Sequence, residues 1–263
     1  SVKDRVAKQM LLDAIESGQL RKGKIILEAT SGNTGIGLAA FGTALGFKVG
    51  IIMPASMSEE RKKVLRAYGA KLILTPAALG MKGALTVLNA LSKRIPNAYI
   101  PNQFHNESNW RAHYNTTALE LWKDMEENID VVVAGIGTGG TIMGLARYLK
   151  IKNPSLLIIG VEPSSSPVLT KGKAGAHKIQ GIGAGFIPPL LDQSLIDEIL
   201  TIDDADAYKE IQNLAKEKGL FLGPSAGAAI CAARILSQRK EYQEKRIAVI
   251  CPDSLERYIS LLN

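Results

Sequence analysis

The stretch Lys24-Ile25-Ile26-Leu27-Glu28-Ala29-Thr30-Ser31-Gly32-Asn33-Thr34-Gly35 contains a short apolar run followed at once by a loop of small polar residues. The run Lys24 to Ala29 is typical of a buried strand. An almost wholly apolar segment, Ile36 to about Leu45, comes next and predicts a helix. A strand, a glycine-containing loop and a helix in direct succession indicate a βαβ unit.

The same succession recurs later in the chain. The run Ile129 to Ala134, apolar except for Asp130, precedes a second glycine loop, Gly135-Ile136-Gly137-Thr138-Gly139-Gly140-Thr141, and a helix to Leu149. Further short strands are predicted at 48–53, 71–74, 98–100, 156–161, 196–202 and 246–251, and helices of ten to fifteen residues separate most of them. This alternation predicts an α/β protein with mainly parallel sheets.

The alternation of predicted strands and helices breaks off near residue 105 and then starts again, which suggests two similar three-layer α/β/α domains with a cleft between them. We assign residues 1–106 to a smaller N-terminal domain and residues 107–263 to a larger C-terminal domain. A long helix is expected from about Trp110 to Met125. The stretch Lys171 to Pro189, rich in Gly and Pro, predicts a loop that lines a site.

Composition excludes several classes of protein. The chain of 263 residues has 46% apolar and 22% charged residues, as in soluble globular proteins, and no apolar run has the length of a membrane span. The net charge of +7 comes from scattered basic groups without interleaved aromatic residues, which argues against nucleic acid. Cys231 and Cys251 lie in apolar runs and are expected to be buried thiols in a reducing cytoplasm. The three histidines and the cysteines lack metal-ligand spacing, so no metal is expected.

Both glycine loops are expected at the carboxyl ends of parallel strands, where open sheets bind ligands. In the second loop, Thr138 and Thr141 add hydroxyl donors to a helix N-terminus, which suits a phosphate. The first loop, Thr30 to Thr34, suits a carboxylate or an array of polar groups. Lys3 is a candidate for a covalent cofactor, because a lysine amine can form a Schiff base with an aldehyde.

A dinucleotide site is the alternative for the second loop. Gly135, Gly137 and Gly140 match G-x-G-x-x-G after a strand, and Glu162 follows 22 residues later. This NAD(P)-dependent alternative leaves the first loop and Lys3 without a role.

An ordered set of motifs covers essentially the whole chain. The set comprises Ser1-Val2-Lys3-Asp4-Arg5, Thr30 to Ala39, Gly80 to Ala84, Asn102-Gln103-Phe104, His113-Tyr114 with Thr116-Thr117, Gly135 to Thr141 and Gly181 to Phe186. It resembles the cysteine synthase (O-acetylserine sulfhydrylase) family of pyridoxal 5′-phosphate (PLP) enzymes, of the tryptophan-synthase-β-like group with PLP fold type II. Because the first motif stands at the start of the chain, we expect an N-terminal segment of the family to be missing here.

The resemblance implies a role for each of the following residues. Lys3 would be the Schiff-base lysine and the proton carrier. Thr30, Ser31, Gly32, Asn33 and Thr34 would bind the substrate carboxylate together with Gln103, and Asn33 would also contact the cofactor. Gly137, Thr138, Gly139, Gly140 and Thr141 would bind the phosphate. Gly183 would lie on the active-site loop, and Ser225 would meet the pyridine nitrogen.

A serine at that nitrogen makes the ring a weaker electron sink than a carboxylate would, which favours β-elimination over transamination. The resemblance therefore implies β-replacement, in which O-acetyl-L-serine and sulfide give L-cysteine through an aminoacrylate. It also implies a cytoplasmic homodimer, with the C-terminal tail of serine acetyltransferase as a partner and no membrane or nucleic acid.

Departures from the family pattern keep the nucleophile open. The run Thr116-Thr117-Ala118-Leu119-Glu120 lacks the common Gly-Pro and leans toward cystathionine β-synthase. That enzyme, or a sulfide-releasing cysteine lyase, is the alternative within the family. A non-catalytic regulator that keeps the fold and docks a partner is a third hypothesis.

Overall fold

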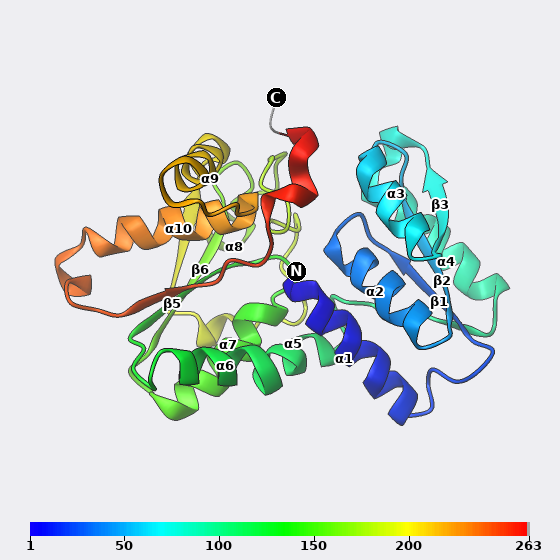
Figure 1. Cartoon of the computed structure of the whole chain (residues 1–263), viewed down its shortest axis with the longest axis horizontal. Helices are drawn as coiled ribbons and strands as arrows, with labels where there is room; N and C mark the ends of the chain where they lie inside the picture. The colour runs from blue at the N-terminus through cyan, green and yellow to red at the C-terminus, as the bar shows by residue number, and fades with distance from the viewer. Residues whose placement is uncertain (262–263) are drawn as a thin grey trace. The chain divides into compact units, whose positions relative to one another are not determined.

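The computed structural model describes residues 1–261, which form two compact units, Ser1–Asn109 and Trp110–Asn263. Each unit contains its own four-stranded sheet (Figure 1). All the strand pairs within these two sheets are parallel. The α/β class with mainly parallel sheets is therefore confirmed.

The first unit is built around a sheet with the strand order β3-β2-β1-β4. Its elements in chain order are α1 (Val2–Glu16), β1 (Ile25–Ala29), α2 (Asn33–Ala44), β2 (Lys48–Pro54), α3 (Glu59–Ala67), β3 (Lys71–Thr75), η1 (Ala77–Leu79), α4 (Gly80–Arg94) and β4 (Ala98–Tyr99). The parallel pairing of β1 with both β2 and β4 places β1 inside the sheet. The loop that follows β1 therefore begins at the carboxyl end of an interior strand.

The two faces of this sheet have different cover. Leu27 and Ala29 of β1 pack with Ala84 and Leu88 of α4 on one face. On the other face α2 lies so close that a Cβ added to Gly42 would stand 2.6 Å from Val49. Helix α1 packs against α2, where a Cβ on Gly37 would stand 2.9 Å from Ala7. Small residues in α2 thus allow three layers of helices and strands to pack closely.

The second unit has the strand order β7-β6-β5-β8. Its elements are α5 (Ser108–Ala112, which begins two residues before the unit), the π-helical turn η2 (His113–Thr117), α6 (Ala118–Asp124), β5 (Val131–Gly135), α7 (Gly140–Lys152), β6 (Leu157–Pro163), α8 (Val168–Lys171), η3 (Gln193–Leu195), β7 (Glu198–Ile202), α9 (Asp204–Lys218), α10 (Pro224–Ser237), η4 (Lys240–Tyr242), β8 (Ile247–Val249) and η5 (Leu255–Leu261).

Alternate residues of β5 enter two separate cores. Val132 and Ala134 belong to a buried cluster with residues of α6 and α7. Val131 and Val133 belong to another cluster with residues of α10. Since successive side chains of a strand point to opposite faces, this sheet is covered by helices on both sides. Such burial on both faces accounts for the continuous apolar run in the sequence.

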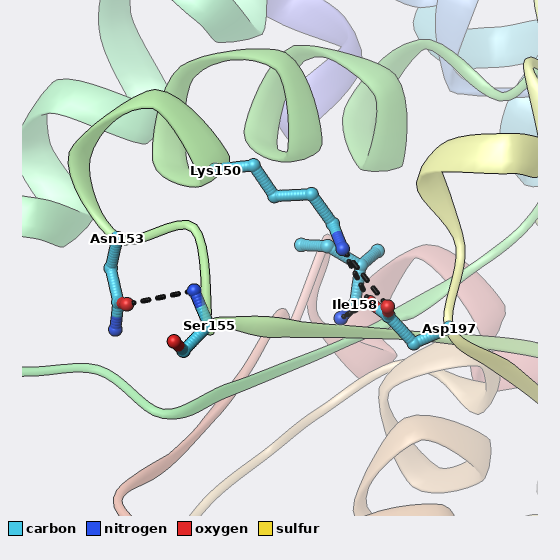
Figure 2. A network of polar contacts seen from close by, with 5 residues as sticks. All are labelled: Lys150, Asn153, Ser155, Ile158 and Asp197. Atoms are coloured by element: carbon cyan, nitrogen blue, oxygen red, sulfur yellow. Dashed lines mark hydrogen bonds and ion pairs between the residues drawn. The ribbon is translucent and has the colours of Figure 1, made fainter.

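Polar contacts join the C-terminal end of α7 to Asp197, the residue before β7, and through it to Ile158 of β6 (Figure 2). The Nζ atom of Lys150 lies 2.8 Å from Oδ2 of Asp197, and the amide of Ile158 donates to the same oxygen at 2.7 Å. Asn153, which ends α7, accepts a hydrogen bond from the amide of Ser155 at 3.0 Å. These bonds anchor α7 at the end opposite to its glycine loop.

One expectation from the sequence needs a refinement and another is wrong. Residues 108–124 are helical without a break, as the sequence predicts, but the turn His113–Thr117 is wound as a π-helix. Cys251 is exposed and Cys231 is half-buried, because β8 ends at Val249 and α10 presents Cys231 near its surface. Among the residues that the structure describes, no helix combines the length and apolarity that a membrane span requires.

Candidate active site

The first glycine loop lies between β1 and α2. Thr30 is buried directly after the strand, and its Oγ1 accepts a hydrogen bond from the amide of Gly32 at 3.2 Å. Helix α2 begins at Asn33, so the loop ends at the N-terminus of a twelve-residue helix. Unpaired amides at such a terminus attract anions.

Gln103 joins this loop from a distant part of the sequence. The Thr34 hydroxyl donates to Oε1 of Gln103 at 2.6 Å, and both side chains are buried. The main-chain carbonyl of Gln103 accepts a hydrogen bond from Nδ2 of Asn109 at 2.8 Å. Because the amide oxygen of Gln103 is an acceptor here, its NH₂ group is the part that can donate to a carboxylate.

Two buried charged side chains make main-chain contacts in this region, Arg61 to the loop itself and Glu28 to the segment that carries Gln103. Arg61 of α3 is buried, and its Nη1 donates to the main-chain carbonyl of Ser31. Glu28 of β1 is buried and accepts a hydrogen bond from the amide of Asn102 at 2.9 Å. Desolvation by burial raises the pKa of Glu28 to about 7, against the opposing effect of the Asn102 and Gln103 amides.

Lys3 lies in the first turn of α1. Ser1 caps this helix by accepting a hydrogen bond from the Lys3 amide at 3.1 Å, and Asp4 completes the capping box. The main-chain oxygen of Lys3 would stand 3.1 Å from a Cβ on Gly37. The first turn of α1 therefore lies against α2, the helix that the Thr30–Thr34 loop opens.

The second glycine loop lies between β5 and α7. Gly139 has φ +83°, a conformation that favours glycine, and it caps α7 at its N-terminus. A Cβ on Gly137 would stand only 2.4 Å from the main-chain oxygen of Gly181. Thr138 and Thr141 are both buried at this terminus. Close main chains, a helix N-terminus and two hydroxyls are the features that hold a phosphate.

The Gly181–Gly185 segment joins the second glycine loop to Ser225. The amide of Gly183 donates to the main-chain oxygen of Ile136 at 3.0 Å, and the oxygen of Gly183 accepts from Nε2 of His177 at 2.9 Å. A Cβ on Gly181 would stand 3.4 Å from Oγ of Ser225. Ser225 is buried in the first turn of α10. The structure thus brings Gly137, Gly183 and Ser225 together around one segment.

His113 stands in one of the sequence motifs, but no role was predicted for it. Its side chain is fully buried in the π-helical turn, and its Nε2 lies 3.1 Å from the hydroxyl of Thr141. Its Nδ1 lies 2.9 Å from the hydroxyl of Thr117. His113 therefore contacts the end of the second glycine loop through the hydroxyl of Thr141. Glu28 and Arg61 were also missed, although a charged residue inside an apolar strand was a visible signal for Glu28.

Glu162 is not available as a dinucleotide ligand. Its carboxylate accepts hydrogen bonds from the amides of Leu169 and Thr170 at 2.8 and 3.0 Å, and from the Thr170 hydroxyl at 2.7 Å. These bonds satisfy the carboxylate within the protein and fix the start of α8. The NAD(P) alternative thereby loses its ribose-binding residue.

A wide hollow of about 640 Å³ lies elsewhere in the second unit, beside the C-terminal half of α7. Its lining includes Trp110, Arg111, Tyr114, Arg147, Lys150 and Ile151. The Arg147 guanidinium lies over the Trp110 ring at 4.3 Å. None of the residues predicted for the site lines this hollow. Among residues 1–261, no group of three or more His, Cys, Asp or Glu side chains could hold a metal ion.

The chemistry of the residues present fits PLP. In the second unit, the N-terminus of α7 with Thr138 and Thr141 suits a phosphate, and Ser225 is a buried hydroxyl of the kind that can bond to a ring nitrogen. In the first unit, Lys3 is an amine of the kind that forms a Schiff base with an aldehyde.

Comparison with known proteins agrees with this fit. The family described as pyridoxal-phosphate dependent enzyme matches residues 1–253. The chain is 48% identical to cysteine synthase B of Campylobacter jejuni, over 99% of this chain and 86% of that protein. It is 46% identical to a probable cysteine synthase of Bacillus subtilis, over 99% of this chain and 84% of that protein.

Solved structures give the same result. The crystal structure of a cysteine synthase (OASS) from Entamoeba histolytica superposes with a TM-score of 0.97 at 44% identity, covering 99% of this chain and 77% of that one. A hydrogen sulfide-producing enzyme from Fusobacterium nucleatum gives 0.93 at 44% identity, covering 98% and 87%. The chain belongs to the pyridoxal-phosphate dependent enzyme family, with the fold of the cysteine synthases.

Proposed function

We propose that this chain is a PLP-dependent cysteine synthase that makes L-cysteine from O-acetyl-L-serine and sulfide. The observation that carries the proposal is 44–48% identity to several proteins named cysteine synthase, most of them over 99% of the chain. The Thr34–Gln103 hydrogen bond and the α7 terminus supply two anion sites of the kind that an amino-acid carboxylate and a phosphate require.

PLP, when bound, withdraws electrons from the substrate and makes its Cα proton acidic. Lys3 would hold the cofactor by its aldehyde until the amino group of the substrate replaces it there. The freed Lys3 amine would then take the Cα proton as acetate leaves from Cβ. The same amine would return the proton once the sulfur of sulfide has bonded to Cβ. Thr30 to Thr34 and Gln103 would orient the substrate carboxylate during both steps, and Gly183 would line its path.

Ser225 would donate or accept one hydrogen bond at the ring nitrogen without placing a negative charge there. Gly137, Thr138, Gly139, Gly140 and Thr141 would bind the phosphate through main-chain amides and hydroxyls. Asn33, the first residue of α2, would contact the cofactor as well as the carboxylate.

A Lys3→Ala variant tests the function. We expect the wild-type protein to be yellow, with a visible band that borohydride removes, and the variant to lose turnover of O-acetylserine and sulfide. Lys8→Ala is the matched control, because Lys8 is exposed on the same helix. Unchanged turnover in Lys3→Ala would contradict the proposal.

Two related activities are separated by the choice of substrate. A cystathionine β-synthase that depends on O-acetylserine, from Helicobacter pylori, has a TM-score of 0.92 to this chain at 40% identity. Turnover should be compared for O-acetylserine with sulfide, serine or O-acetylserine with homocysteine, and cysteine alone. The proposal requires the first pair to give the highest kcat/KM.

The assembly and location belong to the same proposal. We infer a cytoplasmic homodimer that also binds the C-terminal tail of serine acetyltransferase, since a loop that binds an amino-acid carboxylate can accept a peptide's C-terminal carboxylate. Analytical ultracentrifugation tests the dimer. Competition between the tail peptide and O-acetylserine tests the partner, and binding without competition would contradict a shared loop.

A further inference from the structure

Glu28 is an ionisable side chain in the interior of the first unit. It occupies the fourth position of β1, between residues that enter the hydrophobic core, and only 4% of its surface is exposed. Burial of a carboxylate is costly unless hydrogen bonds compensate for the lost water. A charged residue at such a position therefore needs a reason other than packing.

The contacts of Glu28 are main-chain amides that follow β4. Oε2 of Glu28 accepts a hydrogen bond from the amide of Asn102 at 2.9 Å, and the amide of Gln103 also bonds to the carboxylate. Asn102 has φ +53°, in the left-handed region that non-glycine residues rarely adopt. Two amides on one carboxylate hold the main chain in this unusual turn.

The turn controls the Gln103 side chain. Gln103 lies directly after Asn102, and its Oε1 accepts from the buried Thr34 hydroxyl at 2.6 Å. Its main-chain oxygen is bonded to Nδ2 of Asn109 at 2.8 Å. The Glu28 carboxylate therefore acts on the Thr30–Thr34 loop through the segment that carries Gln103.

We propose that Glu28 is a positioning residue for substrate binding: its carboxylate fixes the Asn102–Gln103 main chain and thereby orients the Gln103 amide beside Thr34. The ligand it serves is the α-carboxylate of the amino-acid substrate, so the inference rests on the proposed function. A carboxylate is needed because it accepts from both amides, whereas a protonated carboxyl replaces one acceptor with a donor.

The surroundings make this charge sensitive to pH. Burial raises the pKa of Glu28 to about 7, and the two amides oppose that rise. Helix α2 contains no ionisable side chain, and the residues that α1 buries are Val6, Ala7, Met10, Leu11 and Ala14. Tyr99 of β4 is the titratable neighbour; its pKa is raised to about 12, first by burial and then by the charges of Glu28 and Asp13. The turn should loosen as the pH falls below 7.

Amide hydrogen exchange of the cofactor-free protein tests the proposal without any enzyme activity. In wild type, protection of the Asn102 and Gln103 amides, corrected for intrinsic exchange, should fall about tenfold between pH 8 and pH 6. In Glu28→Gln, protection should be low and the same at both pH values. Glu16→Gln, at an exposed position in α1, is the matched control and should behave as wild type.

Kinetics give the second readout. Glu28→Gln should raise KM for O-acetylserine about tenfold and leave kcat within about twofold, because uniform binding of the carboxylate is lost. Equal protection in wild type and variant at pH 8, or a fall in kcat with unchanged KM, would overturn the proposal. If the variant does not fold, the pH dependence of exchange in wild type decides alone. Absence of cysteine synthase activity in the wild-type protein would reject the proposed function. The hydrogen-exchange result would still test whether Glu28 fixes the Asn102–Gln103 main chain.

Discussion

The hydroxyl of Thr141 lies 3.1 Å from Nε2 of His113, which is fully buried in the π-helical turn before α6. This bond ties the proposed phosphate site to a helix that carries none of the predicted site residues. The neutral ring can donate at one nitrogen and accept at the other, so it can satisfy the hydroxyls of both Thr141 and Thr117.

Replacement of His113 should weaken both the fold and the cofactor site. His113→Ala leaves a cavity and two threonine hydroxyls without their partner, which we expect to cost about 2–4 kcal/mol in the free energy of unfolding. PLP should bind about tenfold more weakly. Urea unfolding and absorbance titration measure the two effects. Thr117→Val removes the Nδ1 bond and leaves the bond between Nε2 and Thr141 in place, so it should retain most of the PLP affinity. Equal loss in both variants would contradict a role through Thr141.

Gly137→Ala should disrupt the proposed phosphate site by steric conflict. The new methyl group would stand 2.4 Å from the main-chain oxygen of Gly181, and a main-chain atom cannot move aside without shifting its loop. We expect PLP affinity to fall by at least tenfold, measured by fluorescence titration. Gly32→Ala is the control for stability alone, since no atom lies within 4 Å of its Cβ position and its φ is −109°. A melting temperature of Gly137→Ala as high as that of Gly32→Ala, or an unchanged PLP affinity of Gly137→Ala, would contradict this explanation.

Ser225→Ala should slow turnover while PLP remains bound. Ser225 is buried at the start of α10, so a hydroxyl there has little access to water and would bond to the cofactor ring. Loss of one such bond should lower kcat about tenfold. Ser237→Ala, at the exposed end of the same helix, is the control and should be neutral. A colourless Ser225→Ala protein would show that the residue holds the cofactor as a whole.

Glu28 should make the stability of the protein depend on pH. Its pKa is about 7 in the folded state against an ordinary value of 4.5, so the folded state binds the proton more tightly. Its contribution is fully present below pH 4.5 and is lost as the pH rises to about 7. The loss should approach 3 kcal/mol, from roughly 1.4 kcal/mol for each pH unit.

Urea unfolding of the cofactor-free protein at pH 5, 6, 7 and 8 measures this effect. The stability of wild type relative to Glu28→Gln should fall with rising pH and become constant above about pH 7. A difference that does not change with pH would contradict the raised pKa. Burial of the Glu28 charge lowers the free energy of unfolding at neutral pH, which is expected of a residue that serves binding at the expense of stability.

The sequence predicted the parallel α/β architecture well because most strands are short, largely apolar runs. Ile129 to Ala134 is one such run apart from Asp130, and the structure places a strand at Val131–Gly135 with a separate core on each face. Glycine loops directly after the strands located the candidate ligand sites for the same local reason. The domain boundary and the roles of the site residues stay predictions.

The supporting contacts could not be predicted, because they join residues that are distant in the sequence. Thr34 and Gln103 are 69 residues apart, and His113 and Thr141 are 28 apart. Periodicity predicted the helix between Trp110 and Met125 but not its π-helical turn, since a single widened turn leaves the apolar pattern nearly helical. Cys251 was expected to be buried because it follows an apolar run, but the strand ends two residues before it.

The π-helical turn His113–Thr117 has a consequence for how this helix can change in length. A π-turn holds one more residue than an α-turn, so it is equivalent to an insertion absorbed within a helix. Deleting one residue there would restore regular winding but rotate the preceding turn by about 100° relative to α6. His113 would then face away from Thr141. The spacing between these two residues is therefore set by an extra amino acid in the helix, and loss of that residue would be more damaging than most substitutions around it.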